Sequence, residues 1–356
     1  MKKLKVAIIG CGGIGAGRHM PSYANMDNVD IIACCDILEE RAKKTAEKFD
    51  VPAYYTDYKE VLKIEGLDAV DICTPNYLHS IIAIDALNAG INVFCEKPDA
   101  KSVEEAEKMK AAAEKSGKLL MVMRNNRYWL TSKFLKKYIE DGKMGEIYAA
   151  KCGWQRRRGI PGKGGWFTTK EQSGGGPLID LGVHMIDLAI WLMGNPKPVS
   201  VTGSTFTKFA NSDVSDSEHS AYGDKMENGT FDVEDLSMGF IKFDNGACMQ
   251  IEFSWASNIE KENSFVQLYG DKAGSSWSTN DGVLKIFTEE YGTTVDYLPN
   301  INNANGTQVH EANLRHFADC LLNGTKPMFE PQQGVDMIKI LDGIYRSAET
   351  GREVLL

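Results

Sequence analysis

The sequence predicts an α/β protein: an N-terminal doubly wound parallel sheet, followed by an α/β domain with a large, mostly antiparallel open sheet. Over residues 1–123, short apolar runs alternate with helical patterns, which is typical of a parallel sheet flanked by helices. Beyond residue 124 the runs alternate apolar and polar residues, which is typical of strands with one covered face. We therefore expect one domain at 1–123 and a second at 124–356.

The strands expected in the first domain are rich in Val, Ile, Ala and Cys and lack period-two alternation, as strands buried on both faces should. They lie at 5–10, 31–36, 69–73, 92–95 and 119–123. Helices between them include 38–49, 81–88 and 103–115. Ser102, with Glu105 three residues later, is the pattern of a capping box. Right-handed crossovers turn this order into a doubly wound sheet.

The second domain begins with an expected helix at 132–141 and continues with alternating runs. These runs lie at 147–157, 200–209, 236–243, 247–255 and 265–269. Between two of them, Asp-Asn-Gly at 244–246 favours a hairpin turn. Residues 211–230 are polar, acidic and aperiodic, so a surface excursion is expected, and helices near 311–322 and 332–350 close the chain. Nothing obvious covers the second face of the sheet, so we expect a homodimer or homotetramer formed through it.

Composition and charge exclude several classes of protein. The net charge of −9 opposes binding to nucleic acid or to an anionic membrane. No apolar run reaches membrane-spanning length, and the N-terminus enters a strand without a cleavage site. The eight cysteines have no Cys-x-x-Cys spacing and lie mostly in apolar stretches. We therefore expect reduced thiols, no metal site and a cytoplasmic protein.

A glycine-rich loop follows the first expected strand. Its spacing, G-x-G-x-x-G, is formed by Gly10, Gly12, Gly13, Ile14 and Gly15. Between a strand and a helix, these glycines let the backbone approach a pyrophosphate that rests on the helix N-terminus. A glycine-rich turn without a ligand is the alternative.

Asp36 ends the second expected strand, about twenty residues past the glycines, where an acid can bind both ribose hydroxyls of NAD. A carboxylate there repels the extra phosphate of NADP, and Ile37 and Leu38 offer no cation. The sequence therefore predicts NAD rather than NADP. A simple capping role for Asp36 is compatible with this one.

Two more loops follow the carboxyl ends of strands, which face the ligand crevice in such sheets. The first predicts cofactor contacts from Thr74, Pro75 and Asn76, whereas His79 is as consistent with helix capping as with cofactor binding. The second carries the tripeptide Glu96-Lys97-Pro98, whose Glu96 and Lys97 we assign to the cofactor site. Lys97 can also orient a substrate hydroxyl and stabilise developing alkoxide charge, although a surface lysine before a turn is the alternative.

An apolar helix expected at 180–193 carries Asp180, His184 and Asp187 on one face. A carboxylate one turn from a histidine orients its ring and raises its basicity, which is the arrangement of a general base near neutral pH. The alternative is a satisfied structural Asp–His pair.

Together these motifs resemble the glucose–fructose oxidoreductase/inositol dehydrogenase (Gfo/Idh/MocA) family. The resemblance spans the chain in order and rests on the glycine loop, Asp36, the Thr74–His79 segment, Glu96-Lys97-Pro98 and Asp180-x-x-x-His184. It implies a Rossmann domain followed by an open-sheet domain, dimers or tetramers, and a catalytic set of Lys97, Asp180 and His184. It also implies NAD-dependent hydride transfer at a secondary hydroxyl of a sugar, glycoside or cyclitol.

Substrate contacts are expected from the loop after the strand at 119–123, where the resemblance places such residues, and from the first strand of the second domain. The candidates are Arg124, Asn126, Tyr128, Trp154, Arg156, Arg158, Trp166 and His184. Their rings can stack on a sugar face and their donors can bind its hydroxyls, but neighbouring arginines also form solvated edges.

Two other functions remain open. One is an NAD-retaining glycosidase that acts through transient oxidation of a ring hydroxyl. The other is a sugar or NAD sensor without catalysis, which the presence of Lys97, Asp180 and His184 disfavours because a sensor needs no base.

Overall fold

The computed structural model describes residues 3–280, 282–301 and 308–356, and it divides into two compact units. The first comprises Met1–Asn125 and Thr307–Ile338, and the second Asn126–Gly306 and Lys339–Leu356. The sequence assigned everything after residue 123 to the second domain. The structure returns helix α9 (Gln308–Asn323) to the first unit, where it packs against α1 (Met20–Ala24) and β1 (Leu4–Ile9).

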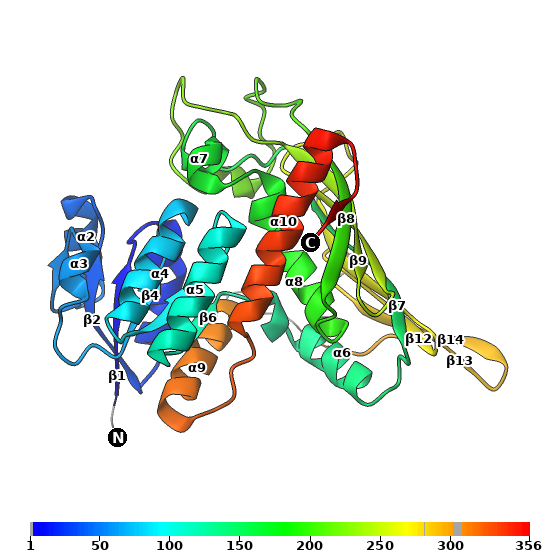
Figure 1. The fold of residues 1–356 in the computed structure, drawn as a ribbon, viewed down its shortest axis with the longest axis horizontal. Helices are drawn as coiled ribbons and strands as arrows, with labels where there is room; N and C mark the ends of the chain where they lie inside the picture. Colours follow the sequence, from blue (N-terminus) through cyan, green and yellow to red (C-terminus); the bar gives the residue numbers. More distant parts are fainter. Residues whose placement is uncertain (1–2, 281, 302–307) are drawn as a thin grey trace. The chain divides into compact units, whose positions relative to one another are not determined.

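The first unit is built on a six-stranded parallel sheet in the order β3-β2-β1-β4-β5-β6 (Figure 1). After β1, the strands are β2 (Val29–Cys35), β3 (Tyr54–Tyr55), β4 (Ala69–Ile72), β5 (Asn92–Cys95) and β6 (Leu120–Val122). The expected strands and the doubly wound fold are confirmed, with strand ends shifted by one or two residues. Only β3 was not predicted, because two residues carry no periodicity.

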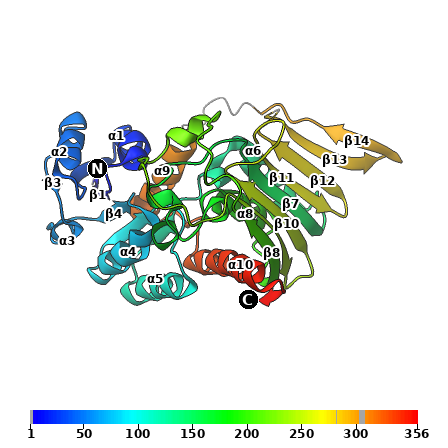
Figure 2. The same cartoon turned by 90° about the horizontal axis from the view of Figure 1, so that it is seen from above.

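Helices cover both faces of this sheet (Figure 2). Helices α4 (His79–Asn88) and α5 (Val103–Ser116) lie on one face, and α1 and α9 lie on the other. The remaining helices are α2 (Glu39–Lys48) and α3 (Tyr58–Val61), with the short turns η1 (Gly15–His19) and η2 (Asn76–Leu78). The Ser102 hydroxyl caps α5 by accepting the Glu105 N–H at 3.2 Å. The Glu105 carboxylate accepts the Lys101 N–H, so the predicted capping box is formed only in part.

The second unit is built on a nine-stranded sheet in the order β14-β13-β12-β11-β7-β10-β9-β8-β15. Its strands are β7 (Ile147–Gln155), β8 (Pro198–Phe206), β9 (Leu236–Phe243), β10 (Cys248–Ser254), β11 (Asn263–Gly270), β12 (Ala273–Ser278), β13 (Leu284–Glu290), β14 (Thr293–Tyr297) and β15 (Val354–Leu355). All pairs are antiparallel except β7 with β10, so the expected mostly antiparallel sheet is confirmed. Strands β12 to β15 were not predicted, because they are short or rich in Ser, Thr and charge.

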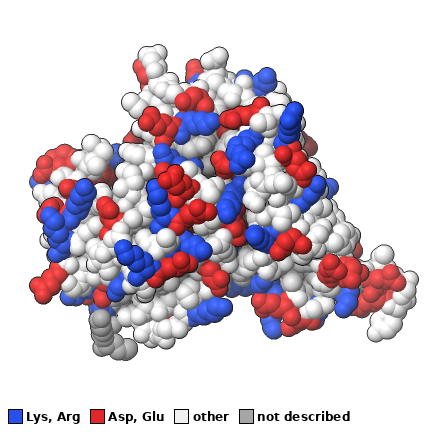
Figure 3. All heavy atoms as spheres, viewed as in Figure 1, with Lys and Arg blue, Asp and Glu red and all other residues white. Residues whose placement is uncertain are grey.

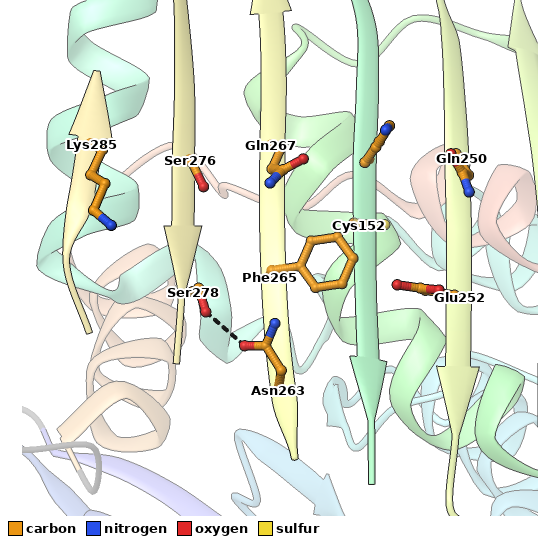
Figure 4. Close-up of a pocket in the computed structure, with 10 residues that line it drawn as sticks. Cys152, Gln250, Glu252, Asn263, Phe265, Gln267, Ser276, Ser278 and Lys285 are labelled. Atoms are coloured by element: carbon orange, nitrogen blue, oxygen red, sulfur yellow. Dashed lines mark hydrogen bonds between the residues drawn. The ribbon is translucent and has the colours of Figure 1, made fainter. Parts of the chain in front are cut away.

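Helices of the second unit cover one face of its sheet. They are α6 (Leu130–Glu140), α7 (Lys170–Ser173), α8 (Val183–Leu192) and the second part of α10 (Pro331–Thr350), with η3 (Asn125–Tyr128), η4 (Trp166–Thr168), η5 (Leu178–Gly182) and η6 (Glu218–Ala221). Alternate residues such as Ile251 and Leu268 are buried on this face. The opposite face carries a shallow groove of about 450 Å³, lined by polar side chains and Phe265 (Figure 4).

The continuous stretch Lys170–Leu192 is long and apolar enough to cross a membrane by length and composition. However, 83% of its most apolar window is buried inside the protein, which is consistent with the core helix of a soluble protein. On the face drawn in Figure 3, acidic and basic side chains of the described residues are interspersed, and acidic ones gather at the β13–β14 hairpin.

Candidate active site

The glycine loop has the backbone shape that a bound pyrophosphate requires. Gly10 has a φ of +105°, and a Cβ there would lie 2.6 Å from the Cys73 carbonyl carbon. A Cβ on Gly15 would lie 2.1 Å from the Gly10 oxygen, so both positions exclude a side chain. By contrast, Gly12 and Gly13 face open space with no atom within 4 Å. This bare backbone at the start of a helical segment fits a dinucleotide phosphate.

Asp36 lies at the end of β2, beside this loop. Its Oδ2 accepts the Cys11 N–H at 3.0 Å, and its Oδ1 accepts the Leu38 N–H at 3.0 Å. The carboxylate therefore fixes the glycine loop and caps the following segment, and its remaining lone pairs can accept ribose hydroxyls. Arg41 lies 3.8 Å from Oδ2, a cation that inspection of Ile37 and Leu38 missed because it comes one helical turn later.

The loop after β4 combines one group suited to a ligand with one structural group. The Thr74 hydroxyl is buried and has no hydrogen-bond partner among the described residues, so it is an orphan beside the glycine loop that a cofactor can satisfy. Asn76 is buried at the start of η2, directly after Pro75. His79 is different: its ring nitrogens lie 2.8 Å from the Pro98 and Thr74 carbonyl oxygens. Burial lowers the pKa of His79. His79 was expected as a cofactor contact, but its ring instead joins the loop after β4 to the loop that contains Pro98.

Glu96 is also committed to protein groups rather than presented to a cofactor. Its Oε1 lies 2.8 Å from His19 Nε2, and its Oε2 accepts the Lys97 N–H at 3.0 Å. The other ring nitrogen of His19 lies 2.7 Å from Asp71 Oδ2, and this whole group is buried. The side chain of Lys97, by contrast, is only half-buried.

The charges in this cluster are coupled. Burial is the largest single influence and opposes a charge on His19, but attraction to Asp71 and Cys73 and hydrogen bonds with them together hold the pKa of His19 well above its usual range. Burial likewise opposes charge on Glu96, yet the hydrogen bond and attraction from His19 hold the pKa of Glu96 well below its usual range. Burial raises the pKa of Cys73 to about 12, so the thiol stays protonated. Although the donor atoms of His19, Asp71 and Cys73 lie within 4.8 Å of one another, they bond each other through protons.

The predicted catalytic helix starts with a π-turn, η5, and continues as α8. Its first N–H groups are capped by Glu234, whose carboxylate accepts the Gly176 and Leu178 N–H groups at 3.0 and 3.1 Å and the Tyr345 hydroxyl at 2.9 Å. Burial raises the pKa of Glu234. Because Glu234 lies nearly sixty residues away in the chain, this cap could not be predicted from the sequence.

Two tryptophan side chains lie beside Asp180 and His184. Trp255 Nε1 donates to Asp180 Oδ2 at 2.9 Å, and the Trp154 ring centroid lies 6.1 Å from that of His184. Asn126 Nδ2 lies 3.4 Å from the backbone oxygen of His184, so Asn126 acts on the helix rather than directly on a substrate. Both catalytic candidates are half-buried, as groups that meet a ligand should be.

Asp187 does not belong with this pair. It forms a bidentate ion pair with Arg127, at 2.8 Å from Nε to Oδ2 and 2.6 Å from Nη2 to Oδ1, and both residues are buried. The three polar residues that the sequence assigned to one face therefore do not act together, because the buried carboxylate of Asp187 needs a cation and Arg127 supplies it.

Arg156 is the predicted substrate residue with the most available bonding capacity. Its guanidinium lies 5.1 Å from the Trp154 ring, and its Nη1 donates to the Gly159 carbonyl at 3.2 Å. The buried Nε has no hydrogen bond among the described residues and lies 3.8 Å from Glu262 Oε1. Ser217, from the acidic excursion, donates to the other oxygen of Glu262 at 3.1 Å. The excursion therefore lies beside the predicted substrate residues.

The other predicted substrate residues have structural partners. Arg124 is buried against Asp99 at 2.5 Å, Tyr128 is buried, and Arg158 donates to the Ser257 carbonyl at 2.9 Å. For these three, packing or hydrogen bonds within the protein already engage the side chain that was expected to contact the substrate. Trp166 is half-buried and stacks on Phe167, with ring centroids 3.8 Å apart.

Several residues around the site were missed from the sequence: His19, Asp71, Glu234, Trp255 and Glu262. Only Asp71 could have been predicted from the sequence. Asp71 is a charge inside a strand that is otherwise apolar and buried on both faces, and such a charge requires a buried partner. The others are placed by contacts distant in sequence.

Comparison with known proteins agrees over nearly the whole chain. Residues 4–124 match an oxidoreductase family with an NAD-binding Rossmann fold, and residues 133–275 match the GFO/IDH/MocA C-terminal domain. The chain is 33% identical to the D-glucoside 3-dehydrogenase of Escherichia coli (strain K12), over 99% of this chain and 97% of that protein. It is 26% identical to the scyllo-inositol 2-dehydrogenase (NAD(+)) of Bacillus subtilis (strain 168), over 92% and 88%. The fold matches levoglucosan dehydrogenase in complex with NADH, at 23% identity and a TM-score of 0.85 over 99% of both chains.

Proposed function

Because the chain belongs to the GFO/IDH/MocA oxidoreductase family, we propose that it oxidises the hydroxyl at carbon 3 of D-glucosides. The family resemblance inferred from the motifs is confirmed. The protein is an NAD-dependent dehydrogenase that acts on CH–OH groups of sugars or cyclitols. The narrower substrate and position follow the relative at 33% identity, which covers both chains almost completely.

The observation that carries the proposal is the arrangement around His184. Its ring lies beside Trp154, and the same indole holds the buried guanidinium of Arg156. An indole offers an apolar face for the C–H side of a pyranose, and the Arg156 Nε offers a hydrogen-bond donor that no described group satisfies. A hexose ring bound there would have its hydroxyls within reach of an imidazole.

In the proposed mechanism, the His184 imidazole takes the proton of the hydroxyl that is oxidised. Asp180, held by Trp255, orients that imidazole and stabilises the imidazolium that forms. The Lys97 ammonium donates a hydrogen bond to the same oxygen and stabilises the negative charge that develops on it. The glycine loop, Asp36 and Thr74 would hold NAD⁺, which would supply the hydride acceptor.

The proposal is tested by following NADH absorbance when the purified protein meets NAD⁺ and a panel of D-glucosides, free aldoses and inositols. Lys97→Ala and His184→Ala variants run in parallel. We expect NADH with D-glucosides, lost in both variants, and a product whose oxo group NMR places at carbon 3. Glycoside cleavage without net NADH would support the cofactor-retaining glycosidase instead. Tight NAD binding without any turnover would support the sensor.

We further propose that the open face of the sheet joins two copies of this chain. Phe206, Met238, Phe240 and Phe287 are each at least 38% exposed, and they alternate with the residues that α8 and α10 cover. The same face carries Lys151, Lys285 and Glu252 around its groove (Figure 4). Apolar side chains and charges of both signs on one face can complement an identical face related by a two-fold axis.

With eight thiols and no disulfide between them, we place the enzyme in the cytoplasm.

A further inference from the structure

His19 is a buried histidine that joins three segments of the first unit. It ends η1, directly after the glycine loop, and none of its surface is exposed. Its Nδ1 lies 2.7 Å from Asp71 on β4, and its Nε2 lies 2.8 Å from Glu96, which directly follows β5. Phe94 covers it edge-on, with ring centroids 6.1 Å apart. One imidazole thus ties the glycine loop to the carboxyl ends of two adjacent strands.

A charged ring satisfies both contacts at once. A neutral imidazole has one N–H group, so its second nitrogen would direct a lone pair at a carboxylate oxygen less than 3 Å away. An imidazolium donates to both carboxylates, and charge-assisted hydrogen bonds of this length are strong. The raised pKa of His19, set against burial by attraction to Asp71, agrees with this state.

The same carboxylate leads from His19 to Lys97. Glu96 uses Oε1 for His19 and Oε2 for the backbone N–H of Lys97 at 3.0 Å. With both oxygens engaged, the carboxyl group cannot rotate without losing one bond. Without a donor at Oε1, Glu96 would be a buried charge with one protein partner fewer, and it would turn or draw in water. Either response weakens the hydrogen bond from the Lys97 N–H to Glu96, which holds the Lys97 backbone in place.

We propose that His19 is a positioning residue for Lys97, acting through Glu96, so that the cofactor loop and the reacting lysine are held in one geometry. This inference rests on the proposed role of Lys97 in the reaction. It gives a chemical reason for a buried charge cluster where an apolar side chain of similar volume would pack at no desolvation cost. It also accounts for Glu96, whose carboxylate points away from solvent.

Two amide substitutions of His19 separate its contact with Asp71 from its contact with Glu96. In His19→Gln the amide NH₂ group stands near the position of Nε2 and keeps a donor to Glu96, whereas in His19→Asn it stands near Nδ1 and serves only Asp71. We expect His19→Asn to lower kcat about tenfold with the KM for NAD⁺ within about twofold of wild type, and His19→Gln to retain kcat within about threefold. His316→Asn and His316→Gln are the controls, since His316 accepts the Met328 N–H and lies outside the site.

A second readout needs no turnover. Hydrogen–deuterium exchange of the peptide that contains Lys97 is measured without NAD or sugar, and we expect about tenfold faster exchange of the Lys97 amide in His19→Asn but not in His19→Gln. If wild type oxidises no sugar, the proposed function fails while the exchange experiment still decides the positioning role. Equal losses in both His19 variants, or unchanged exchange in His19→Asn, would overturn the inference. If His19→Asn does not fold, Glu96→Ala takes its place, since it removes the acceptor of the Lys97 N–H and should expose the same amide.

Discussion

Trp255 Nε1 donates a 2.9 Å hydrogen bond to Asp180 Oδ2, which fixes the carboxylate that precedes His184 by one helical turn. In Trp255→Phe the ring volume is largely kept but the donor is lost. Asp180 then loses one of the contacts that orient its carboxylate, so the tautomer and direction of the His184 imidazole are less well defined. We expect kcat to fall about tenfold, equivalent to about 1.4 kcal/mol, with little change in the KM for NAD⁺.

A second tryptophan of the same unit provides the control for this variant. The Trp277 indole N–H is buried and has no hydrogen-bond partner among the described residues, and its ring packs on Trp129. Trp277→Phe therefore removes the same atoms without breaking a hydrogen bond. Steady-state rates for both variants decide the matter, and a kcat for Trp255→Phe equal to that of Trp277→Phe would mean that the bond to Asp180 is unimportant.

Substitution of Asp187 is expected to lower the stability of the protein, whereas substitution of Asp180 is expected to lower kcat. Asp187→Ala leaves the Arg127 guanidinium buried without its carboxylate, which costs about 3–5 kcal/mol of unfolding free energy. Asp180→Asn keeps the volume of a half-buried side chain but removes its charge, and we expect kcat to fall at least about a hundredfold with little loss of stability. Urea unfolding and steady-state kinetics on both variants test this pair. A stable Asp187→Ala variant with a hundredfold lower kcat would instead place Asp187 in the proton-transfer group.

The contrast between these two aspartates shows where sequence reasoning reached its limit. Spacing placed Asp180, His184 and Asp187 on one face, because a helix was assumed to be regular throughout. The structure places a π-turn at Leu178–Gly182, around Asp180, and pairs Asp187 with Arg127, which is sixty residues away in the chain. Periodicity finds the helix and its polar residues, but the partner of each residue is decided by tertiary packing.

The same limit explains which parts of the first unit were found. Strands buried on both faces and a glycine loop are local patterns, so β1, β2, β4, β5 and β6 were predicted within two residues of their ends. Arg124 and His79 follow strand ends as cofactor or substrate residues do, yet Asp99 and two carbonyl oxygens hold them. A motif predicts where a residue lies in the fold, whereas the hydrogen bonds of its side chain depend on chain segments that are distant in sequence.

Asp36 and Arg41 together are expected to set the choice of cofactor. The carboxylate repels a ribose 2′-phosphate, while the guanidinium 3.8 Å away would attract one. In Asp36→Ser the repulsion is gone, so we expect the ratio of kcat/KM for NADP⁺ to that for NAD⁺ to rise about a hundredfold. Adding Arg41→Ala should reverse most of the gain for NADP⁺. If the double variant uses NADP⁺ as well as Asp36→Ser does, Arg41 is not the phosphate contact.

The charged state of His19 predicts how stability changes with pH. Its folded pKa lies well above the unfolded value of about 6.5, so the folded protein holds a proton that the unfolded chain releases. This stabilisation is complete below pH 6.5 and is lost as the pH rises towards the folded pKa, by at most about 1.4 kcal/mol per pH unit. The ionisable groups that face His19 are Asp71, Cys73 and Glu96, with Tyr23 and His310 nearby.

Thermal unfolding between pH 6 and pH 9 tests this dependence. Wild type should lose stability progressively over that range, whereas His19→Gln, which cannot titrate, should start lower and show a flatter profile. His316→Gln, which keeps the His19 cluster intact, should follow the wild-type slope. Parallel profiles for wild type and His19→Gln would mean that other groups govern the alkaline loss of stability.

Phe240 and Met238 lie on the open face of the sheet and are 38% and 42% exposed. They face the same side as Gln250 and Glu252 on β10, with which they pair. If a second copy covers this face, two lysines introduced there would be buried against each other across the two-fold axis, which is strongly unfavourable. We expect Met238→Lys/Phe240→Lys to have a mass near the 39.4 kDa of one chain by light scattering, and wild type to have at least twice that mass.

Ile81→Lys is the control for this variant, because Ile81 is 49% exposed on α4, which belongs to the other unit. It adds one positive charge to an exposed apolar site and should leave the mass unchanged. Circular dichroism confirms that each variant remains folded, since both changes lie on surfaces that no described helix covers. A wild-type protein that is monomeric at about 10 µM, well within the range where obligate dimers persist, would show that this face has another partner or none.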